Sequence, residues 1–403
     1  MTPPYIGRLI AVVAVAAVAA VAVGGAIASR QGPTSASSLD AAPLGGTTSF
    51  TPIPSAATTP SPTPILTPTL TPKPKLTPTP PPTSTPSAPP AGPIALQPAK
   101  LTQGRDPQVT YRLDHTVLGA GKELKVPGSS SLMDVARLGS SVLATTAGGE
   151  LLKVDSAGAV VRRTPNVMTL IGTADQSAAV YATTPPVIVG QQTYGATLFV
   201  DNGGSVKSLE LPDVQSIFVL AYAKNTVYYK ASGKGGVLTS KLYSWTPGAA
   251  KPALVKTVAG DPTTVSGDGR LASVVPTKSS PDGCSTVVEI ATGKKRFKTC
   301  DYRITGFTPD GSVAIGTPAY GDSFCSNIIT ALDSRSGAVR NQWSGCFYRA
   351  AAEDEQHVLM VAVVTGGGQD PNTTSTVVRC SLETAACERA TKVVAAKQID
   401  FAR

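Results

Sequence analysis

The chain has 403 residues, a formal net charge of +9 and two histidines, His115 and His357. So few imidazoles argue against a histidine-based catalytic set and against a histidine-rich metal site. Aromatic residues make up only 5% of the chain and Val, Ile and Thr are common, which favours many short strands over long helices. The basic residues are scattered rather than clustered, which excludes a typical nucleic-acid groove.

The N-terminal segment is predicted to direct export. Residues 9–28 form an uncharged run of 20 residues behind Arg8, long enough to cross a bilayer as a helix, with residues 1–8 as its cytoplasmic flank. We therefore expect a single-pass signal anchor in the cell membrane, with the rest of the chain outside the cytoplasm. Because Ala26-Ile27-Ala28 has the form of a cleavage site, secretion after cleavage near Ala28 is the alternative.

A linker follows the apolar run. Residues 31–93 are polar, and residues 51–93 consist mostly of Pro and Thr. Such a composition cannot bury a core and resists both helix and sheet, so we expect a disordered, extended stalk. At about 3.1 Å per residue, the Pro/Thr stretch could reach on the order of 130 Å.

The remaining chain repeats a strand–turn–strand unit. The turn glycines of five such units follow one another at steps of 45, 45, 45 and 44 residues: Gly158, Gly203, Gly248, Gly293 and Gly337. A second series of turns lies between them, with Asp268 and Asp310 42 residues apart. Each period therefore holds two hairpins, and four short antiparallel strands per period are typical of a β-propeller blade.

One repeat carries a family resemblance. The segments GFTPDGSVAIGT and ITALDSRSGAVRNQW resemble the repeat of WD-type and Tol-system propellers, in which an aromatic-x-Pro-Asp-Gly turn joins the inner strands. The resemblance is close over residues 306–342 and loose over residues 107–403. It implies a bacterial cell-surface β-propeller, an architecture that hosts binding and catalysis alike.

The number of blades follows from the period. Residues 94–403 are predicted to form the propeller domain, and their 310 residues correspond to about seven periods, of which six are complete. We expect the seventh to be split: residues 108–128 supply outer strands and residues 398–403 supply the inner strand, which closes the ring. Six blades is the alternative.

Six cysteines bracket three of the predicted outer hairpins. Facing residues of an antiparallel hairpin have a constant sum, and three cysteine pairs centre on outer turns: Cys284 with Cys300, Cys325 with Cys346, and Cys380 with Cys387. We predict these as disulfides, consistent with export to an oxidising compartment. A metal site would need paired C-x-x-C spacing, which is absent from the sequence, so no metal and no cofactor are expected.

A Tyr-Arg pair recurs where the chain re-enters toward an innermost strand. We predict that Tyr302, Arg303, Tyr348 and Arg349 line one mouth of the channel and bind a partner. The alternative is that Tyr packs between blades while Arg pairs with acids or caps carbonyls. The acidic run of residues 353–355 is expected to be a solvated turn.

No catalytic residues are predicted, because no nucleophile, base and orienting group occur in a recognisable motif. The sequence favours a membrane-tethered, extracytoplasmic binding module rather than an enzyme. Its partner would be a cell-wall polymer or another surface protein, with membrane contact through the N-terminal helix and no nucleic acid. The alternative is a propeller hydrolase or lyase acting on extracellular glycan or peptide material.

Overall fold

The computed structural model describes residues 92–402, apart from 187–192, 235–239, 277–282, 321–323, 369 and 396–398. The predicted cytoplasmic flank, the apolar run of residues 9–28 and nearly all of the linker lie outside the described residues. Among the residues that are described, no helix has the length and apolar character to cross a membrane.

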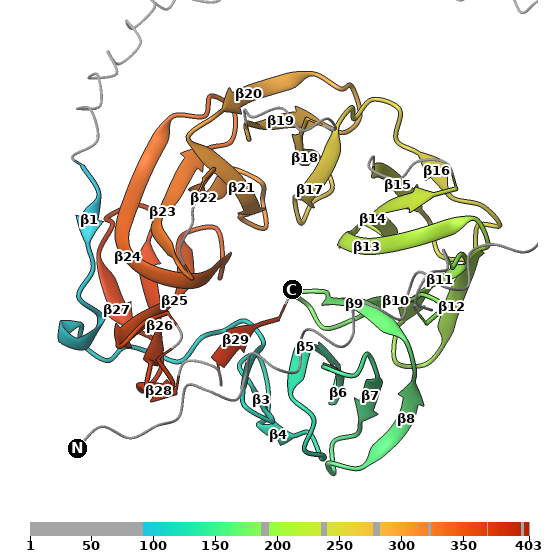
Figure 1. The fold of residues 1–403 in the computed structure, drawn as a ribbon, viewed down its shortest axis with the longest axis horizontal. Coiled ribbons are helices and arrows are strands. Elements are labelled where there is room, and N and C mark those ends of the chain that lie inside the picture. Colours follow the sequence, from blue (N-terminus) through green and yellow to red (C-terminus); the bar gives the residue numbers. More distant parts are fainter. Residues whose placement is uncertain are drawn as a thin grey trace, which may run out of the picture. The chain divides into compact units, whose positions relative to one another are not determined.

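The described strands form a ring of antiparallel sheets (Figure 1). One sheet has β5 (Leu132–Leu138), β6 (Ser141–Thr146), β7 (Leu151–Val154) and β8 (Val160–Thr164). The next has β9 (Val167–Gly172), β10 (Ala179–Thr183), β11 (Ala196–Asp201) and β12 (Val206–Leu211). Then come β13 (Val214–Ala223), β14 (Thr226–Gly233), β15 (Lys241–Trp245) and β16 (Ala253–Leu254). A further sheet has β17 (Asp261–Val265), β18 (Leu271–Val275), β19 (Ser285–Glu289) and β20 (Lys295–Thr299).

A nine-stranded sheet completes most of the ring. Its main path is β21 (Tyr302–Phe307), β22 (Val313–Pro318), β23 (Ser326–Asp333), β24 (Val339–Ala352), β25 (His357–Thr365), β26 (Thr374–Ser381) and β27 (Cys387–Arg389). Two short strands lie off this path: β1 (Ile94–Ala95) pairs with β24, and β28 (Val394–Ala395) pairs with β26.

Strand β24 belongs to two successive groups of four strands, which we call sets. Its first part pairs with β23 up to Phe347, and its second part pairs with β25 from Phe347 onward, with a register shift before Arg349. Divided there, the strands of the described residues form seven four-stranded sets, including the set described next. Because one continuous strand belongs to two sets, the count of seven blades stays a prediction that depends on this division.

The two ends of the propeller sequence meet in one sheet. Strand β29 (Ile399–Phe401) pairs with β2 (Tyr111–Leu113), followed by β3 (Thr116–Leu118) and β4 (Leu124–Lys125). Phe401 faces Tyr111 and Asp400 faces Arg112 in this pairing. The predicted split unit, with an inner strand from the C-terminus, is therefore confirmed.

An acidic side chain reinforces this closure. Asp400 forms an ion pair with Arg349 of β24 at 3.1 Å and lies 3.7 Å from Arg112 of β2. Arg349 also donates a hydrogen bond to the Phe401 carbonyl oxygen at 3.3 Å. One carboxylate thus links the neighbouring innermost strand to both strands of the closing pair.

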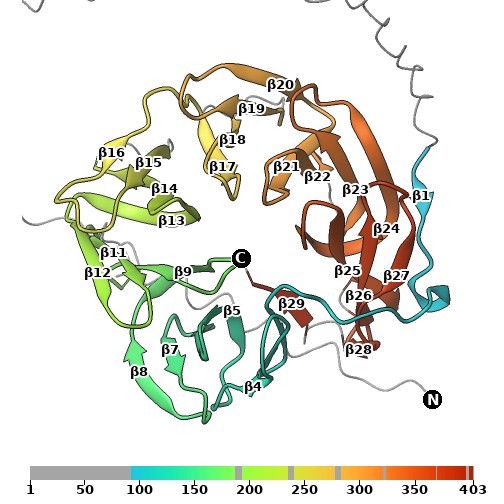
Figure 2. The same cartoon turned by 180° about the vertical axis from the view of Figure 1, so that it is seen from behind.

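The segment before β2 covers the outside of the nine-stranded sheet. Figures 1 and 2 both show β1 beside the outer edge of β24, where it pairs in parallel with Trp343 and Ser344. Farther along, Gln103 forms a bridge with Arg389 of β27. Unpaired edge strands invite association with other chains, so this N-terminal strap, residues 94–104, protects two outer edges.

The core lies between neighbouring sheets. The second strand of most sets is buried on both faces, as in β6, β10 and β25, because each sheet is covered by the sheets on either side. Leu198 of β11, for example, shares a cluster with Tyr229 of β14. The closing sheet is packed in the same way, since Phe401 clusters with Leu359 and Val117 clusters with Val142.

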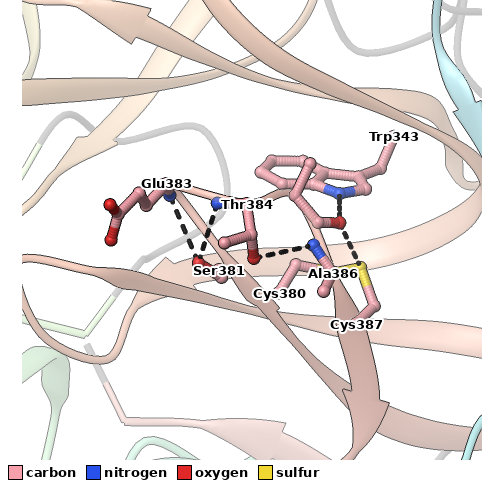
Figure 3. Close-up of a disulfide and its surroundings, with 8 residues drawn as sticks. Trp343, Cys380, Ser381, Glu383, Thr384, Ala386 and Cys387 are labelled. Carbon is pink, nitrogen blue, oxygen red and sulfur yellow. Dashed lines mark hydrogen bonds between the residues drawn. A yellow bond between two sulfur atoms is a disulfide. The ribbon is translucent and has the colours of Figure 1, made fainter.

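The three predicted disulfides are confirmed, and all six cysteines are paired. Figure 3 shows the third, in which Cys380 and Cys387 face each other across β26 and β27. The indole N–H of Trp343 donates to the carbonyl oxygen of Ala385, within the turn that this disulfide spans. The Ser381 hydroxyl accepts two backbone N–H groups in the same turn. Trp343 belongs to the neighbouring set, where it pairs with Ile329 of β23, so this contact fixes the hairpin to that set.

Removing a disulfide should destabilise the ring according to the length of chain that it closes. We expect Cys380→Ala with Cys387→Ala, which opens a separation of 7 residues, to lower the free energy of unfolding by about 2 kcal/mol. Cys325→Ala with Cys346→Ala, which opens 21 residues, should lower it by about 3 kcal/mol. Denaturant unfolding measures both values, and circular dichroism should keep its β signal. The reverse order would contradict this interpretation.

Breaking the closing ion pairs should also cost stability. Asp400→Ala leaves Arg349 and Arg112 without a carboxylate at a site that is only 21% exposed, so we expect a loss of about 1–2 kcal/mol in unfolding free energy. Glu383→Ala, in an exposed turn of the neighbouring nine-stranded sheet, is the control and should change stability little. Equal effects of the two variants would show that Asp400 has no special part in closure.

Candidate binding site

The two faces of the ring carry different connections. On one face, turns join each innermost strand to the second strand, such as Lys224-Asn225 between β13 and β14. On the other face, connections join second strands to third strands, for example residues 147–150 between β6 and β7. Antiparallel neighbours alternate in direction, so these connections lie on the face opposite the inner turns. We call this side the loop face and the other side the turn face.

Large apolar side chains are exposed near the loop face. Met133 of β5 is 55% exposed, Met168 of β9 is 52% exposed and Phe218 of β13 is 38% exposed. These residues lie in the first half of three successive innermost strands, and so toward the end away from the inner turns. Since methionine and phenylalanine are normally among the most buried residues, three of them on adjacent strands form an apolar arc that needs an explanation.

β-Bulges account for much of this exposure. The register of β5 shifts between Leu132 and Val135, which leaves Met133 outside the regular pairing. In β9, Met168 is skipped between Val167 and Thr169, and in β24, Tyr348 is skipped between Phe347 and Arg349. A bulge turns a side chain away from the direction that strand alternation would give it. Innermost strands of this ring therefore present residues that would otherwise enter the core.

Arg303 and Tyr348 meet on the same face. Both line a cavity of about 270 Å³ formed by the ends of β21, β22, β23 and β24. Phe324, which is 64% exposed, lies at its rim. Among the described residues, Arg303 takes part in none of the ion pairs. The structure thus brings these two predicted residues together, and their role in binding stays a prediction.

The other two predicted residues lie elsewhere. Successive residues of a strand point to opposite faces of its sheet, so Tyr302 points away from the cavity that Arg303 lines, and its role in binding stays a prediction. The Tyr302 hydroxyl instead accepts a hydrogen bond from the side-chain amide of Gln342 in the same sheet. Arg349 belongs to the ring closure through Asp400. For Arg349, the alternative of pairing with an acid is the one that the structure shows.

Lys230 lies beside the apolar arc, next to Phe218. The Lys230 ammonium lies 5.7 Å from the centre of the Phe218 ring and 3.3 Å from the Asp261 carboxylate. Cations are attracted to the faces of aromatic rings, so this contact helps to hold the Phe218 ring in place. The loop face therefore combines an apolar arc with basic and aromatic groups on both sides.

The acidic run at residues 353–355 differs from the expectation of a solvated turn. The Glu353 side chain is only 1% exposed and is paired with buried Arg379 of β26. It also accepts the backbone N–H of Gln108 at 2.6 Å. The prediction was wrong for Glu353 because its partners come from distant parts of the sequence. No local pattern in the turn reveals them.

Arg379 is the centre of this network. Its guanidinium donates to Glu388 at 2.7 Å and to the carbonyl oxygens of Arg105 and Asp106, both at 2.9 Å. Burial works to lower the pKa of Arg379, but hydrogen bonds from the guanidinium to Glu353 and Glu388 outweigh it and raise the pKa. The network ties the end of the N-terminal strap region to β25–β27, and we call it the Arg379 clasp.

The clasp also accounts for one group of side chains with metal-ligand chemistry. Ligand atoms of Glu353, Asp354 and His357 lie within 4.8 Å of one another. Both oxygens of Glu353, however, accept hydrogen bonds from Arg379. His357 Nδ1 lies 2.9 Å from the Asp354 carboxylate. These groups are therefore engaged with one another and with the clasp.

Comparison with known proteins finds likeness in solved structures alone. Neither a protein-family model nor a curated protein matches the chain. Among solved structures, a prolyl endopeptidase aligns with a TM-score of 0.51 and 15% identity, covering 73% of this chain and 50% of that chain. The β-propeller domain of Cps50 (Swd1) from Myceliophteria thermophila aligns with a TM-score of 0.43 and 11% identity, covering 67% and 88% of the two chains. An oligogalacturonate lyase in complex with manganese aligns with a TM-score of 0.46 and 13% identity, covering 62% and 79%.

Likeness at such low identity concerns the fold alone. The ring of four-stranded sheets confirms the predicted all-β propeller class, and propeller structures such as Cps50 (Swd1) align with the chain. This likeness assigns no activity and no partner to the chain.

The Arg379 clasp should be important for stability. Arg379→Ala leaves Glu353 charged and buried without its partner, so we expect a loss of about 3–5 kcal/mol in unfolding free energy. The control is Arg163→Ala, because the ion pair of Arg163 with Glu150 is 59% and 39% exposed and should contribute less than about 1 kcal/mol. Denaturant unfolding compares the two variants. A similar, small loss in both would contradict the assigned role of the clasp.

Proposed function

We propose that this chain is an extracytoplasmic, membrane-tethered β-propeller that binds a partner protein through its loop face. The observation that carries the proposal is the apolar arc of Met133, Met168 and Phe218, which lies on the same face as Arg303 and Tyr348. Interfaces between proteins are enriched in Met, aromatic residues and Arg, and residues of these kinds contribute most of the binding energy.

The extracytoplasmic location is supported by the disulfides. All six cysteines are paired within hairpins, which is typical of proteins that fold in an oxidising compartment. The uncharged run of residues 9–28 would supply the membrane anchor, and the linker of residues 31–93 would hold the propeller away from the membrane. Secretion after cleavage near Ala28 is the alternative for location.

A protein partner suits the exposed side chains better than a cell-wall polymer does. Flexible methionine side chains adapt to apolar groups of a partner, whereas polysaccharides present mostly hydroxyl groups. Arg303 adds a donor group that could pair with an acidic residue at the edge of the contact. We therefore favour another surface protein, with an acidic group beside an apolar segment, over a wall polymer.

An enzyme is the second candidate. A propeller hydrolase or lyase would need two carboxylates, or a carboxylate and a metal, that converge on the substrate. On the described part of the loop face, Asp261 is already paired with Lys230. Hydrolysis or lytic cleavage of a glycan or peptide by the purified protein would overturn the preference for a binding module.

The proposal is tested by placing charge on the apolar arc. We expect Met133→Glu with Met168→Glu to weaken retention of the full-length protein on immobilised surface-protein extract by at least tenfold, because burying two carboxylates in an apolar contact is unfavourable. Arg303→Ala should weaken retention by a smaller factor. Retention on purified wall polymers is measured in parallel.

The matched control is Val161→Glu. Val161 is 57% exposed and lies on outer strand β8 of the same sheet as Met133, so it tests for a general effect of added charge. It should retain wild-type binding. Equal retention by the wild type and the double variant would eliminate the arc as the contact surface, and retention on wall polymer alone would exclude the protein partner.

A further inference from the structure

A larger cavity lies on the turn face, away from the proposed contact surface. Its volume is about 750 Å³, and it lies between the β17–β20 sheet and the set of β21–β24. Its walls come from the inner turns at 269–271 and 310–312 and from the outer turns at 289–291 and 333–335. A volume of this size is within the usual range for pockets that bind small molecules.

Four arginines line this cavity: Arg270, Arg296, Arg335 and Arg340. Arg270 pairs with Asp268, Arg296 with Glu289, and Arg340 with Asp333. Arg270 also donates through Nη2 to the carbonyl oxygen of Asp310 at 2.8 Å. Among the described residues, no ion pair includes Arg335. Four guanidinium groups carry about 20 N–H donors in total, and these contacts occupy only a few of them.

The acidic groups of the cavity are already engaged. Asp333 accepts hydrogen bonds from Arg340 at 2.6 Å and from two backbone N–H groups of its own turn at 3.0 Å. Asp310 accepts the Thr308 hydroxyl at 2.7 Å and the Ser312 N–H at 3.0 Å. Glu289 accepts the Thr292 hydroxyl at 2.6 Å as well as the Arg296 guanidinium. The cavity thus offers spare donors but few spare acceptors.

The charges of these carboxylates are fixed by the same contacts. Burial works to raise the pKa of Asp333, but hydrogen bonds from Arg340, from Ser336 and from the Arg335 N–H outweigh it and lower the pKa to about 2. Burial likewise opposes the ionisation of Asp310, while hydrogen bonds from Thr308 and Ser312 lower its pKa. Both groups are therefore ionised at neutral pH. With Asp268, the carboxylates equal the four arginines in number, so the spare guanidinium donors, rather than a net charge, favour an oxyanion.

We propose that this cavity binds a small anionic molecule whose carboxylate or phosphate oxygens accept hydrogen bonds from the arginines, with Arg335 as the principal contact. The planar guanidinium group donates in pairs to both kinds of oxyanion. The Tyr228 ring and Ile290, which also line the cavity, offer an apolar surface for the remainder of the ligand. This site is independent of the loop face, since no residue is shared between them.

The test uses two simple probes, inorganic phosphate and citrate. Isothermal titration calorimetry of the purified full-length protein is run with each probe, with sodium chloride at the same ionic strength as the reference. We expect saturable binding of at least one probe, and the preferred probe identifies the ligand as a phosphate or a carboxylate. Arg335→Ala should weaken that binding about tenfold, the effect expected for loss of a charge-assisted hydrogen bond.

The control variant is Lys251→Ala, which removes the same charge from an exposed position outside this cavity. It should bind as the wild type does, which separates a specific contact from the general effect of net charge. Absence of saturable binding to both probes would overturn the proposal, as would equal affinity of the wild type and Arg335→Ala. Neither outcome affects the loop face, which is tested by retention on protein.

Discussion

Closure of the ring by β29 is the constraint on which the other features depend. Each sheet packs mainly on its two neighbours, and β29 joins β2 in the packing of the closing sheet against β25. Three residues supply that strand, and a strand so short cannot provide much hydrogen bonding alone. The packing of Phe401 against Leu359 and the ion pair between Asp400 and Arg349 add the contacts that it lacks.

Other stabilising contacts lie in the sets that directly precede the closing sheet in the sequence. The three disulfides lie in the successive sets from β17 to β27. The N-terminal strap and the Arg379 clasp hold the last of these sets from outside. The sets from β5 to β16 have no cysteine, and they carry the apolar arc. The arginine cavity thus lies between two sets that carry disulfides, whereas the arc lies on sets without them.

The regular features of this fold could be predicted because each follows from local geometry. The turn glycines mark the period because their turns need a backbone that other residues adopt with strain. Gly293 and Gly337 have φ values of 71° and 75°. A Cβ atom at Gly337 would also lie 2.6 Å from the Phe297 ring. The disulfide pairing followed from the constant sum of facing residues in a hairpin.

The irregular features could not be predicted, because they depend on contacts far apart in the sequence. Met133 and Met168 stand in apolar strand patterns that normally indicate core positions, and only the bulges expose them. The acidic residues around Glu353 indicate a solvated turn, because its partners Arg379 and Gln108 are distant in the sequence. The two Tyr-Arg pairs repeat in sequence, yet the alternation of strand side chains separates Tyr302 from Arg303.

Departures from the repeat distinguish both proposed sites from the framework around them. The ion pairs Glu289–Arg296 and Asp333–Arg340 join residues with the same spacing in successive outer hairpins, which is the behaviour of a repeated structural element. Arg335 breaks that pattern, because Ala291 stands at the same distance before the glycine of the preceding turn. On the loop face, Phe218 and Tyr348 likewise differ from the methionines Met133 and Met168 that stand in the innermost strands β5 and β9. A repeated residue is explained by the hairpin that it stabilises. An exposed residue that departs from the repeat has no such structural explanation, and binding of a partner or ligand provides one.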